Sequence, residues 1–403
     1  MTQLDPRLHA FREGLAAAAL QDRVRAPRYS EGEVRQVAAP VVPVRVAPRF
    51  EAALATEALS GELLTVYDIR DGWAWVQLRE DGYVGYTPLD GLSTMVEENT
   101  HRVSARLTYL YPAPDMKRPP ITKMSFSCTV APIGKLEGRF VELSRGGFIF
   151  ADHLVGIRER AKDFVRVAER LVGAPYLWGG KTTLGIDSSG LVQLAQTAAG
   201  IRCPRDSDMQ LASAGEPIDP SNLDAIQRGD LLFWKGHVAI AQSADWMIHA
   251  SGHHMEVVVE QIRRAVERTA ETHGPLLAIL RPNLESQTTA PAAPGVAARR
   301  TTAPEMPAPR NSTSKPESPA TVAVTTQPAP PSPNQKTEAQ GANLSRPVSG
   351  KPAGTPLPPQ ASERQERVVE TKHADAKGAR PVEKSGPTEE TKKAANRPGT
   401  QKV

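Results

Sequence analysis

Four short blocks in the middle of the chain combine polar side chains with glycines and other small residues. In chain order they read Pro175-Tyr176-Leu177-Trp178-Gly179-Gly180, Gly185-Ile186-Asp187-Ser188-Ser189-Gly190, Gly236-His237-Val238-Ala239-Ile240 and Met247-Ile248-His249-Ala250-Ser251. A nucleophile at the first turn of a helix feels the positive end of the helix dipole, which lowers the pKa of a thiol. A histidine on an adjacent strand can act as its base, and a second histidine can orient the first ring. The order of the blocks therefore favours nucleophilic catalysis.

The segments around these blocks predict the elements that would position them. Phe164, Val167, Ala168 and Leu171 share one helical face, and a second helix is expected from Ser189 to near Gly200. Strand-like runs follow at residues 230–234, 237–241, 246–249 and 256–260. Helices followed by an antiparallel meander predict an α+β domain over residues 157–283.

The segment before this domain has a different texture. Residues 38–97 hold short runs of aromatic and β-branched residues separated by Asp-Gly turns, which predict a small antiparallel barrel. Residues 98–156 repeat the pattern more weakly, for example at Gly138-Arg139-Phe140-Val141-Glu142-Leu143. Residues 1–37 are predicted to be a lead-in, with a charged helix over residues 1–35.

The four blocks, in this order, resemble the NlpC/P60 cysteine peptidases, a papain-like group that cuts γ-D-glutamyl–diamino acid bonds in cell-wall peptides. The two predicted barrels resemble tandem bacterial SH3-like domains, which precede the peptidase domain in members that trim murein peptides with a free N-terminal L-Ala. The resemblance implies an α+β papain-like domain behind two all-β SH3-like barrels. It also implies murein peptides (L-Ala-γ-D-Glu-diamino acid) or peptidoglycan as partners.

The resemblance assigns roles position by position. It places the nucleophile at Ser188, the base at His237, the orienting residue at His249 and an oxyanion-stabilising tyrosine at Tyr176. The positions that would line the site for the peptide's amine and carboxylates are Asp187, Ser189, Asp206 and Ser207. Trp178 fits either a wall of the site or core packing.

The chain departs from the family pattern at the nucleophile. The family motif reads Asp-Cys-Ser-Gly, and this chain reads Asp187-Ser188-Ser189-Gly190. A thiol with a pKa of about 8.5 is readily held as a thiolate beside a histidinium, whereas an alcohol is not. We therefore expect very little hydrolysis. Three hypotheses stay open: a weakened peptidase, a non-catalytic murein-peptide-binding pseudoenzyme or scaffold, and a serine introduced to trap substrate.

Other chemistries are not indicated. His249, His253 and His254 leave a predicted strand through Ser251-Gly252, so they do not share a helical face as metal ligands would. Phosphate-loop and dinucleotide fingerprints are absent from the sequence. We therefore predict no metal and no cofactor.

The last part of the chain differs in composition. Residues 284–403 contain no Phe, Trp, Tyr or Cys and 19 of the 36 prolines, and they hold 17 Lys and Arg against 11 Asp and Glu. Such a segment cannot bury enough apolar surface to order, so we predict a disordered basic tail. Its basic residues alternate with acidic ones, which disfavours a nucleic-acid partner.

The cysteine content and the hydropathy of the sequence indicate where in the cell the protein is expected. Cys128 and Cys203 are far apart in sequence, and two buried reduced thiols fit better than a disulfide framework. The run from Leu15 to Leu20 is too short to span a bilayer, and the first residues lack the features of a secretory signal. The expected location is the cytoplasm, with export by another route as the alternative. Oligomeric state stays open.

Overall fold

The computed structural model describes residues 4–283, and the predicted disordered tail over residues 284–403 lies outside them. The N-terminal segment forms a small three-stranded sheet in the order β1-β2-β3 in place of the expected helix, so that prediction is wrong. Its elements are β1 (Phe11–Arg12), β2 (Leu15–Ala17), the 3-10 turn η1 (Ala18–Leu20) and β3 (Tyr29–Ser30). Leu15, Ala17 and Leu20 are buried with Trp75 of the following barrel. This tertiary burial outweighs the helix propensity of the alanine run.

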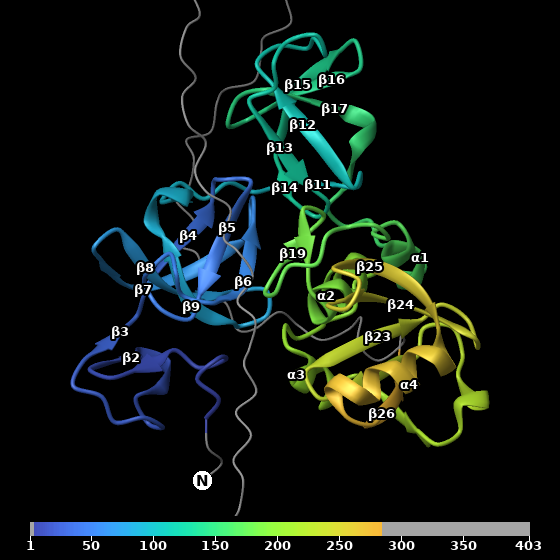
Figure 1. Cartoon of the computed structure of the whole chain (residues 1–403). Coiled ribbons are helices and arrows are strands. Elements are labelled where there is room, and N and C mark those ends of the chain that lie inside the picture. The colour runs from blue at the N-terminus through green and yellow to red at the C-terminus, as the bar shows by residue number, and fades with distance from the viewer. Residues whose placement is uncertain (1–3, 284–403) are drawn as a thin grey trace, which may run out of the picture. The chain divides into compact units, whose positions relative to one another are not determined.

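The first barrel is a seven-stranded sheet in the order β10-β4-β7-β8-β9-β5-β6 (Figure 1). Its elements are β4 (Glu33–Val37), β5 (Val41–Arg45), β6 (Leu54–Leu59), β7 (Leu63–Arg70), β8 (Trp73–Leu78), β9 (Val84–Pro88), η2 (Leu89–Gly91) and β10 (Leu92–Ser93). Asp71 and Gly72 form the turn between β7 and β8 with φ angles of 51° and 77°, as a tight Asp-Gly hairpin requires. The barrel starts before residue 38, because β4 pairs with β7.

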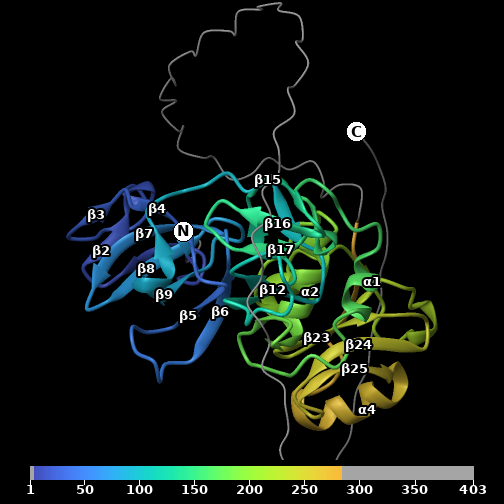
Figure 2. The same cartoon turned by 90° about the horizontal axis from the view of Figure 1, so that it is seen from above.

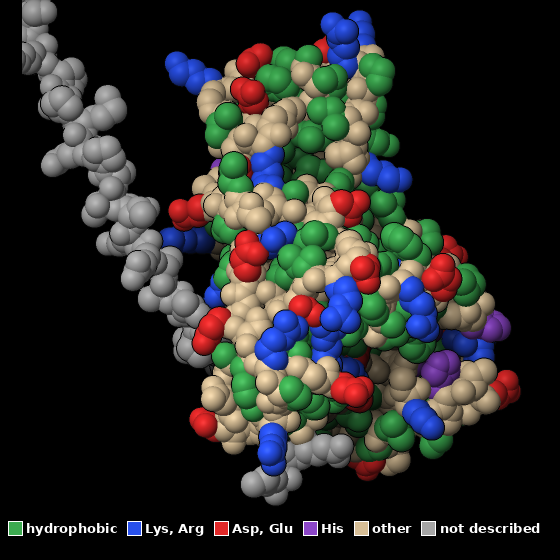
Figure 3. Space-filling view, turned by 90° about the vertical axis from the view of Figure 1, so that its left-hand side faces the viewer, with side chains coloured by type: hydrophobic (Ala, Val, Ile, Leu, Met, Phe, Trp, Pro, Cys, Tyr) green, Lys and Arg blue, Asp and Glu red, His purple; other side chains and the backbone are tan. Residues whose placement is uncertain are grey.

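A second group of short strands lies where the weaker repeat was predicted. Its elements are β11 (His101–Val103), β12 (Leu107–Tyr111), β13 (Thr122–Ser125), β14 (Thr129–Val130), β15 (Pro132–Glu137), β16 (Phe140–Leu143), β17 (Phe148–Phe150), η3 (Ala151–His153) and β18 (Leu154–Gly156). These strands form a five-stranded sheet in the order β13-β12-β17-β16-β15 and a three-stranded sheet in the order β14-β11-β18. Figure 3 shows charged side chains of both signs on one face of the molecule.

The remaining elements form the predicted α+β domain. They are α1 (Phe164–Glu169), β19 (Lys181–Thr182), β20 (Gly185–Ile186), α2 (Ser188–Ala198), α3 (Ser207–Leu211), β21 (Glu216–Ile218), η4 (Leu223–Ala225), β22 (Leu231–Trp234), β23 (His237–Ala241), β24 (Trp246–Ser251), β25 (Glu256–Gln261), α4 (Ile262–His273) and β26 (Ala278–Arg281). The main sheet has the order β21-β26-β22-β23-β24-β25. All of its strand pairs are antiparallel.

This sheet lies between helices. Leu191 and Leu194 of α2 share a core with Val238, Ile240 and Ile248 on one face of the sheet. On the other face, α4 packs its buried residues Ile262 and Ala265 into a second core, and Figure 2 shows the sheet between α2 and α4. The alternation of side chains along β23 explains how one strand serves both cores.

Buried polar contacts join the first barrel to the α+β domain. Lys181 donates from its backbone nitrogen to Glu57 at 2.7 Å and from its ammonium to Glu62 at 2.9 Å. Because the Lys181 side chain is only 6% exposed, this pair holds the two parts together away from solvent. Within residues 4–283, no helix is long and apolar enough to cross a membrane.

Candidate active site

Ser188 is the first residue of α2, at the position expected for a nucleophile. Asp187 caps this helix by accepting a hydrogen bond from the Gly190 amide at 2.7 Å. The Ser188 residue is buried, with 6% of its surface exposed. A nucleophilic atom at position 188 therefore lies at the positive end of the helix dipole.

The two predicted histidines lie together on neighbouring strands. His237 opens β23 directly after the Lys235-Gly236 turn, and His249 lies in β24. Their rings are joined by a hydrogen bond of 2.8 Å between Nε2 of His237 and Nδ1 of His249. The ring of His237 also packs against Trp234 and His273, with centroids 5.6 Å and 5.4 Å away.

The packing of α2 against the sheet determines where Ser188 lies relative to the two histidines. Helix α2 packs on β23 and β24, which carry the two rings. Among the hydrogen bonds of residues 4–283, none joins the Ser188 hydroxyl to His237, and none uses Nδ1 of His237. The histidine pair is therefore already formed, whereas the link to Ser188 is not.

Burial controls the charge of both rings. Desolvation lowers the pKa of His237 well below its ordinary value, and the neighbouring His249 lowers it further. Desolvation also lowers the pKa of His249, although its hydrogen bond to Glu260 works in the opposite direction. Both imidazoles are therefore neutral at pH 7, and a neutral ring can act as a base.

Sequence reasoning missed Glu260, the acidic partner of His249. Nε2 of His249 lies 2.6 Å from an oxygen of Glu260, which also accepts from Arg268 of α4 at 2.6 Å. Burial disfavours ionisation of Glu260. Hydrogen bonds from His249 and His254 and the charge of Arg268 nevertheless lower its pKa to about 2. The β-strand pattern of residues 256–260 held no signal for this role, since a glutamate on a strand usually faces solvent.

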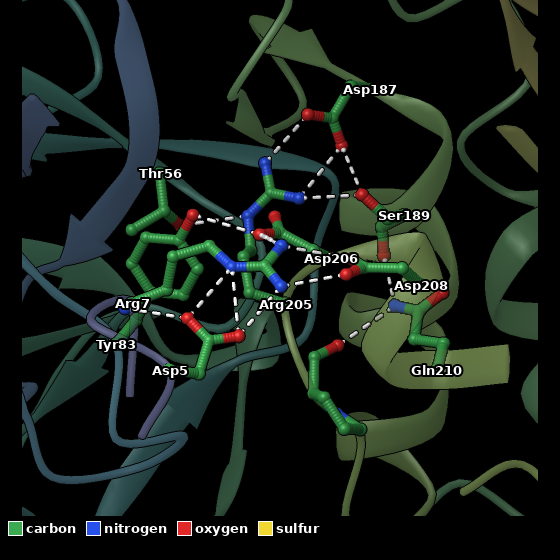
Figure 4. A network of polar contacts seen from close by, with 11 residues as sticks. Asp5, Arg7, Thr56, Tyr83, Asp187, Ser189, Arg205, Asp206, Asp208 and Gln210 are labelled. Atoms are coloured by element: carbon green, nitrogen blue, oxygen red, sulfur yellow. Dashed lines mark hydrogen bonds and ion pairs between the residues drawn. The ribbon is translucent and has the colours of Figure 1, made fainter. Parts of the chain in front are cut away.

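Arg205 is a second residue that the sequence did not single out. It is 1% exposed and donates to both oxygens of Asp187, at 2.9 and 2.8 Å. The same guanidinium donates to the hydroxyl of Ser189 at 2.9 Å and, across to the first barrel, to Thr56 at 2.8 Å (Figure 4). Asp187 and Ser189, predicted to line the substrate site, are thus both held by Arg205 beside the start of α2.

Asp206 belongs to the same network. It precedes α3, whose first residue is Ser207, and accepts a hydrogen bond from the Tyr83 hydroxyl of the first barrel at 2.9 Å. Arg7 of the N-terminal segment donates to Asp206 at 2.8 Å and to Asp208 at 2.7 Å. Figure 4 shows Arg7 and Arg205 on this group of carboxylates. Burial raises the pKa of Asp206, and the bond from Tyr83 partly offsets that effect.

Tyr176 and Trp178 differ in their surroundings. Tyr176 is half-buried, its amide donates to Met255 at 2.8 Å, and burial raises the pKa of its hydroxyl, with the nearby Asp187 adding to the effect. The residue that follows the β24 strand, Gly252, lies beside the Tyr176 ring. Trp178 is 66% exposed, which excludes core packing and leaves its face available to a ligand.

Close packing of the backbone near Trp178 explains why residue 179 is a glycine. Gly179 has a φ of 77° and its amide donates to Asp187 at 2.7 Å. A Cβ atom there would lie 2.5 Å from the Leu54 carbonyl oxygen of the first barrel. Only glycine satisfies both conditions.

The two thiols contact backbone carbonyls and not Ser188: Cys128 donates to Pro40 and Cys203 to Pro204. Cys128 and Cys203 are both buried and unpaired, as expected from the sequence. Burial raises the pKa of each thiol, that of Cys128 to about 12. Within residues 4–283, no group of three or more His, Cys, Asp or Glu side chains is placed to hold a metal ion.

A helix that begins at a candidate nucleophile and packs on antiparallel strands bearing paired histidines is the arrangement expected of a papain-like domain. Comparison with known proteins makes this class more specific. Residues 44–92 match the bacterial dipeptidyl-peptidase SH3 domain, and residues 173–272 match the NlpC/P60 family. The chain therefore carries a bacterial SH3-type domain over residues 44–92 and an NlpC/P60 domain over residues 173–272.

Individual relatives agree with this assignment. Dipeptidyl-peptidase 6 of Lysinibacillus sphaericus is 36% identical over 119 residues, which are 30% of this chain and 41% of that protein. The γ-D-glutamyl-L-lysine dipeptidyl-peptidase of Bacillus cereus is 28% identical over 230 residues, or 49% of this chain and 67% of that protein. This chain thus spans less than half the length of the Lysinibacillus protein.

A solved structure supports the fold. The NlpC/P60 family protein from Bacillus cereus superposes with a TM-score of 0.51 at 19% identity, covering 62% of this chain and 99% of that chain. The two structures therefore share one fold, in which all-β barrels precede an α+β domain, as expected from the sequence.

Proposed function

We propose that this chain recognises murein peptides at the bond between γ-D-glutamate and a diamino acid, and that Ser188 leaves it a weak hydrolase. The observation that carries the proposal is the hydrogen-bonded pair of His237 and His249, whose strands pack on the helix that Ser188 begins. Relatives named as γ-D-glutamyl-L-lysine dipeptidyl-peptidases support the substrate class.

The proposed reaction uses the neutral histidine pair. Because Nε2 of His237 is engaged by His249, Nδ1 takes the proton from the nucleophile as it attacks the γ-glutamyl carbonyl carbon. The hydroxyl of Tyr176 stabilises the resulting oxyanion. The C–N bond then breaks, His237 returns the proton to the leaving amine, and water hydrolyses the acyl-enzyme.

The oxygen of serine makes the first step slow. Its pKa lies far above that of a thiol, so the helix dipole and a histidine cannot hold it ionised. Its shorter bond to carbon also displaces the attacking atom, and a misplacement on the order of 1 Å can cost ~100-fold in rate. Binding does not depend on this atom.

The test is the Ser188→Cys variant, assayed by mass spectrometry on L-Ala-γ-D-Glu-meso-diaminopimelate and on the L-Lys tripeptide. We expect hydrolysis at least ~100-fold faster than in the Ser188 protein, since a preorganised thiolate replaces an alcohol. Ser188→Ala is the matched control for the loss of the attacking atom, and His237→Ala in the Ser188→Cys background should abolish the gain. A folded Ser188→Cys protein that cleaves no faster than the Ser188 protein would contradict the proposed catalytic role of this position.

A second candidate function is binding without hydrolysis. It is favoured by the two cysteines of the chain, which are both buried and donate to the backbone carbonyls of Pro40 and Pro204, so that neither replaces a thiol at position 188. Calorimetry with the tripeptide should then give a dissociation constant in the micromolar-to-millimolar range usual for enzyme substrates. No heat at millimolar peptide with folded protein would refute both candidates.

A further inference from the structure

The carboxylate of Glu260 contacts His249 on the side away from His237. Glu260 was not among the site residues predicted from the sequence. Glu260 lies in β25, the strand next to β24, and one of its oxygens is 2.6 Å from Nε2 of His249. The side chain of Glu260 is 18% exposed, and His249 is 1% exposed. The chain of contacts therefore runs from His237 through His249 to Glu260 within the protein interior.

The contact sequence constrains where the protons lie. An ionised carboxylate only accepts hydrogen bonds, so Nε2 of His249 must be the protonated nitrogen. When that ring is neutral, its Nδ1 accepts, and Nε2 of His237 donates to it across 2.8 Å. The remaining nitrogen, Nδ1 of His237, then carries a lone pair.

We propose that Glu260 is a positioning residue that fixes the tautomers of His249 and His237, so that Nδ1 of His237 is the basic nitrogen. This inference rests on the proposed function, in which His237 takes the proton from residue 188. Glu260 acts through His249 and touches no substrate.

The alternative proton arrangement would disable the base. A doubly protonated His249 would donate from Nδ1 to Nε2 of His237, and a neutral His237 would then carry its proton on Nδ1. Burial and the positive charge of Arg268 oppose a charged His249. The charged or titratable groups that face this chain of contacts are Arg268 and His273 of α4, and His254, whose Nε2 lies 3.3 Å from Glu260.

This arrangement bears on a serine nucleophile in particular. A thiol is partly ionised before attack, so it tolerates an imperfect base. A serine depends on removal of its proton during attack, and only a neutral ring with its lone pair on the correct nitrogen can do so. Residual hydrolysis by the Ser188 protein should therefore be more sensitive to Glu260 than hydrolysis by the Ser188→Cys variant.

The first test reads the tautomers directly. Long-range ¹H–¹⁵N NMR of ¹⁵N-histidine protein, assigned with His237→Asn and His249→Asn variants, should show Nε2–H on both rings. Glu260→Ala should give a mixture of tautomers at His249 and His237. Glu260→Gln should retain the Nε2–H form, because the amide oxygen still accepts. Glu256→Ala is the control, since Glu256 is an exposed glutamate at the start of the same strand.

The second test reads catalysis in the Ser188→Cys background. Glu260→Ala should lower kcat about 10- to 100-fold with KM within about 3-fold, the scale of a general-base contribution that is only partly lost. Glu260→Gln should recover part of the loss, and circular dichroism should show both variants folded. An Nδ1–H form of His249 in the unsubstituted protein, or tautomers unchanged in Glu260→Ala, would overturn the inference and leave the proposed function standing. Correct tautomers in an inactive Ser188→Cys protein would instead refute the proposed function alone.

Discussion

Arg7 and Asp206 lie 199 positions apart in the sequence, and their side chains meet at 2.8 Å between the guanidinium and the carboxylate. The backbone of Arg7 is anchored to the first barrel, where its carbonyl accepts from the Val84 amide at 2.8 Å. The N-terminal segment thereby places the guanidinium of Arg7 against the carboxylates of Asp206 and Asp208 at the start of α3. The family resemblance places Asp206 among the residues that line the site for the peptide's amine and carboxylates. We expect its carboxylate to bind the amine, so Arg7 would compete with the ligand.

Arg7→Ala should therefore tighten binding of a murein tripeptide with a free amine. The Arg7 side chain is 37% exposed, so the gain should be about 2- to 5-fold, the scale of a partly exposed ion pair. Calorimetry at low and high salt measures it, and the gain should shrink with salt. Arg12→Ala is the matched control, because Arg12 belongs to the same segment but pairs with Asp68. Weaker binding by Arg7→Ala would show that Arg7 assists the ligand.

The buried pair of Arg205 and Asp187 should be important for stability. Arg205→Ala would leave the Asp187 carboxylate buried without its cation, at a cost of about 3–5 kcal/mol. We expect the thermal midpoint to fall by roughly 6–15 °C. Arg202→Ala, at an exposed position three residues earlier, is the control and should change it by less than about 2 °C. If Arg205→Ala fails to fold, Asp187→Asn should show a smaller loss in the same direction. An unchanged midpoint in both would contradict the structure of this network.

Stability should fall on acidification in two steps. The pKa values of His237 and His249 are lowered in the folded chain. As the pH falls below about 6.5, the ordinary pKa of histidine, these two residues are therefore protonated in the unfolded chain before they are protonated in the folded chain. The free energy of unfolding decreases over this pH range. The pKa of Glu260 is about 2 against an ordinary 4.5, so its contribution is present above 4.5 and is lost as the pH falls from 4.5 toward 2. Urea unfolding across pH 7 to 3 measures both steps.

The Glu260→Gln variant isolates the second step. Its stability deficit against the unsubstituted protein should shrink as the pH falls below about 4.5, because the lost carboxylate no longer contributes there. A deficit that stays constant from pH 7 to pH 3 would show that Glu260 is not stabilised by its partners.

Thiol labelling should distinguish position 188 from the two natural cysteines. Cys128 and Cys203 are buried and their pKa values are raised, so the native Ser188 protein should take up almost no iodoacetamide at pH 7. The Ser188→Cys variant should incorporate one label per chain, located by peptide mass spectrometry. Rapid labelling of Cys203 in the Ser188 protein would show that its surroundings open in solution.

The sequence by itself predicted the elements whose signals are local. Alternating residues predicted most strands of the first barrel, and the helix expected from Ser189 begins one residue earlier, at Ser188, after its capping residue Asp187. Helical and strand-like runs predicted Ser188 beside the start of a helix and His237 and His249 on two strands of one domain, and the family resemblance suggested their roles. These features depend on neighbours within a few residues, so they can be read along the chain.

Contacts between distant segments were decided only by the tertiary structure. The alanine-rich run over residues 15–20 favours a helix locally, but burial against Trp75 makes it a strand and a turn. Arg205 reaches Thr56 across 149 positions, and Arg7 reaches Asp206 across 199. Glu260 differs from an ordinary strand glutamate only because β25 pairs with β24 and α4 brings Arg268 to its carboxylate. These roles depend on contacts between segments that are far apart in the chain. Such contacts produce no periodic or local pattern from which they could be predicted.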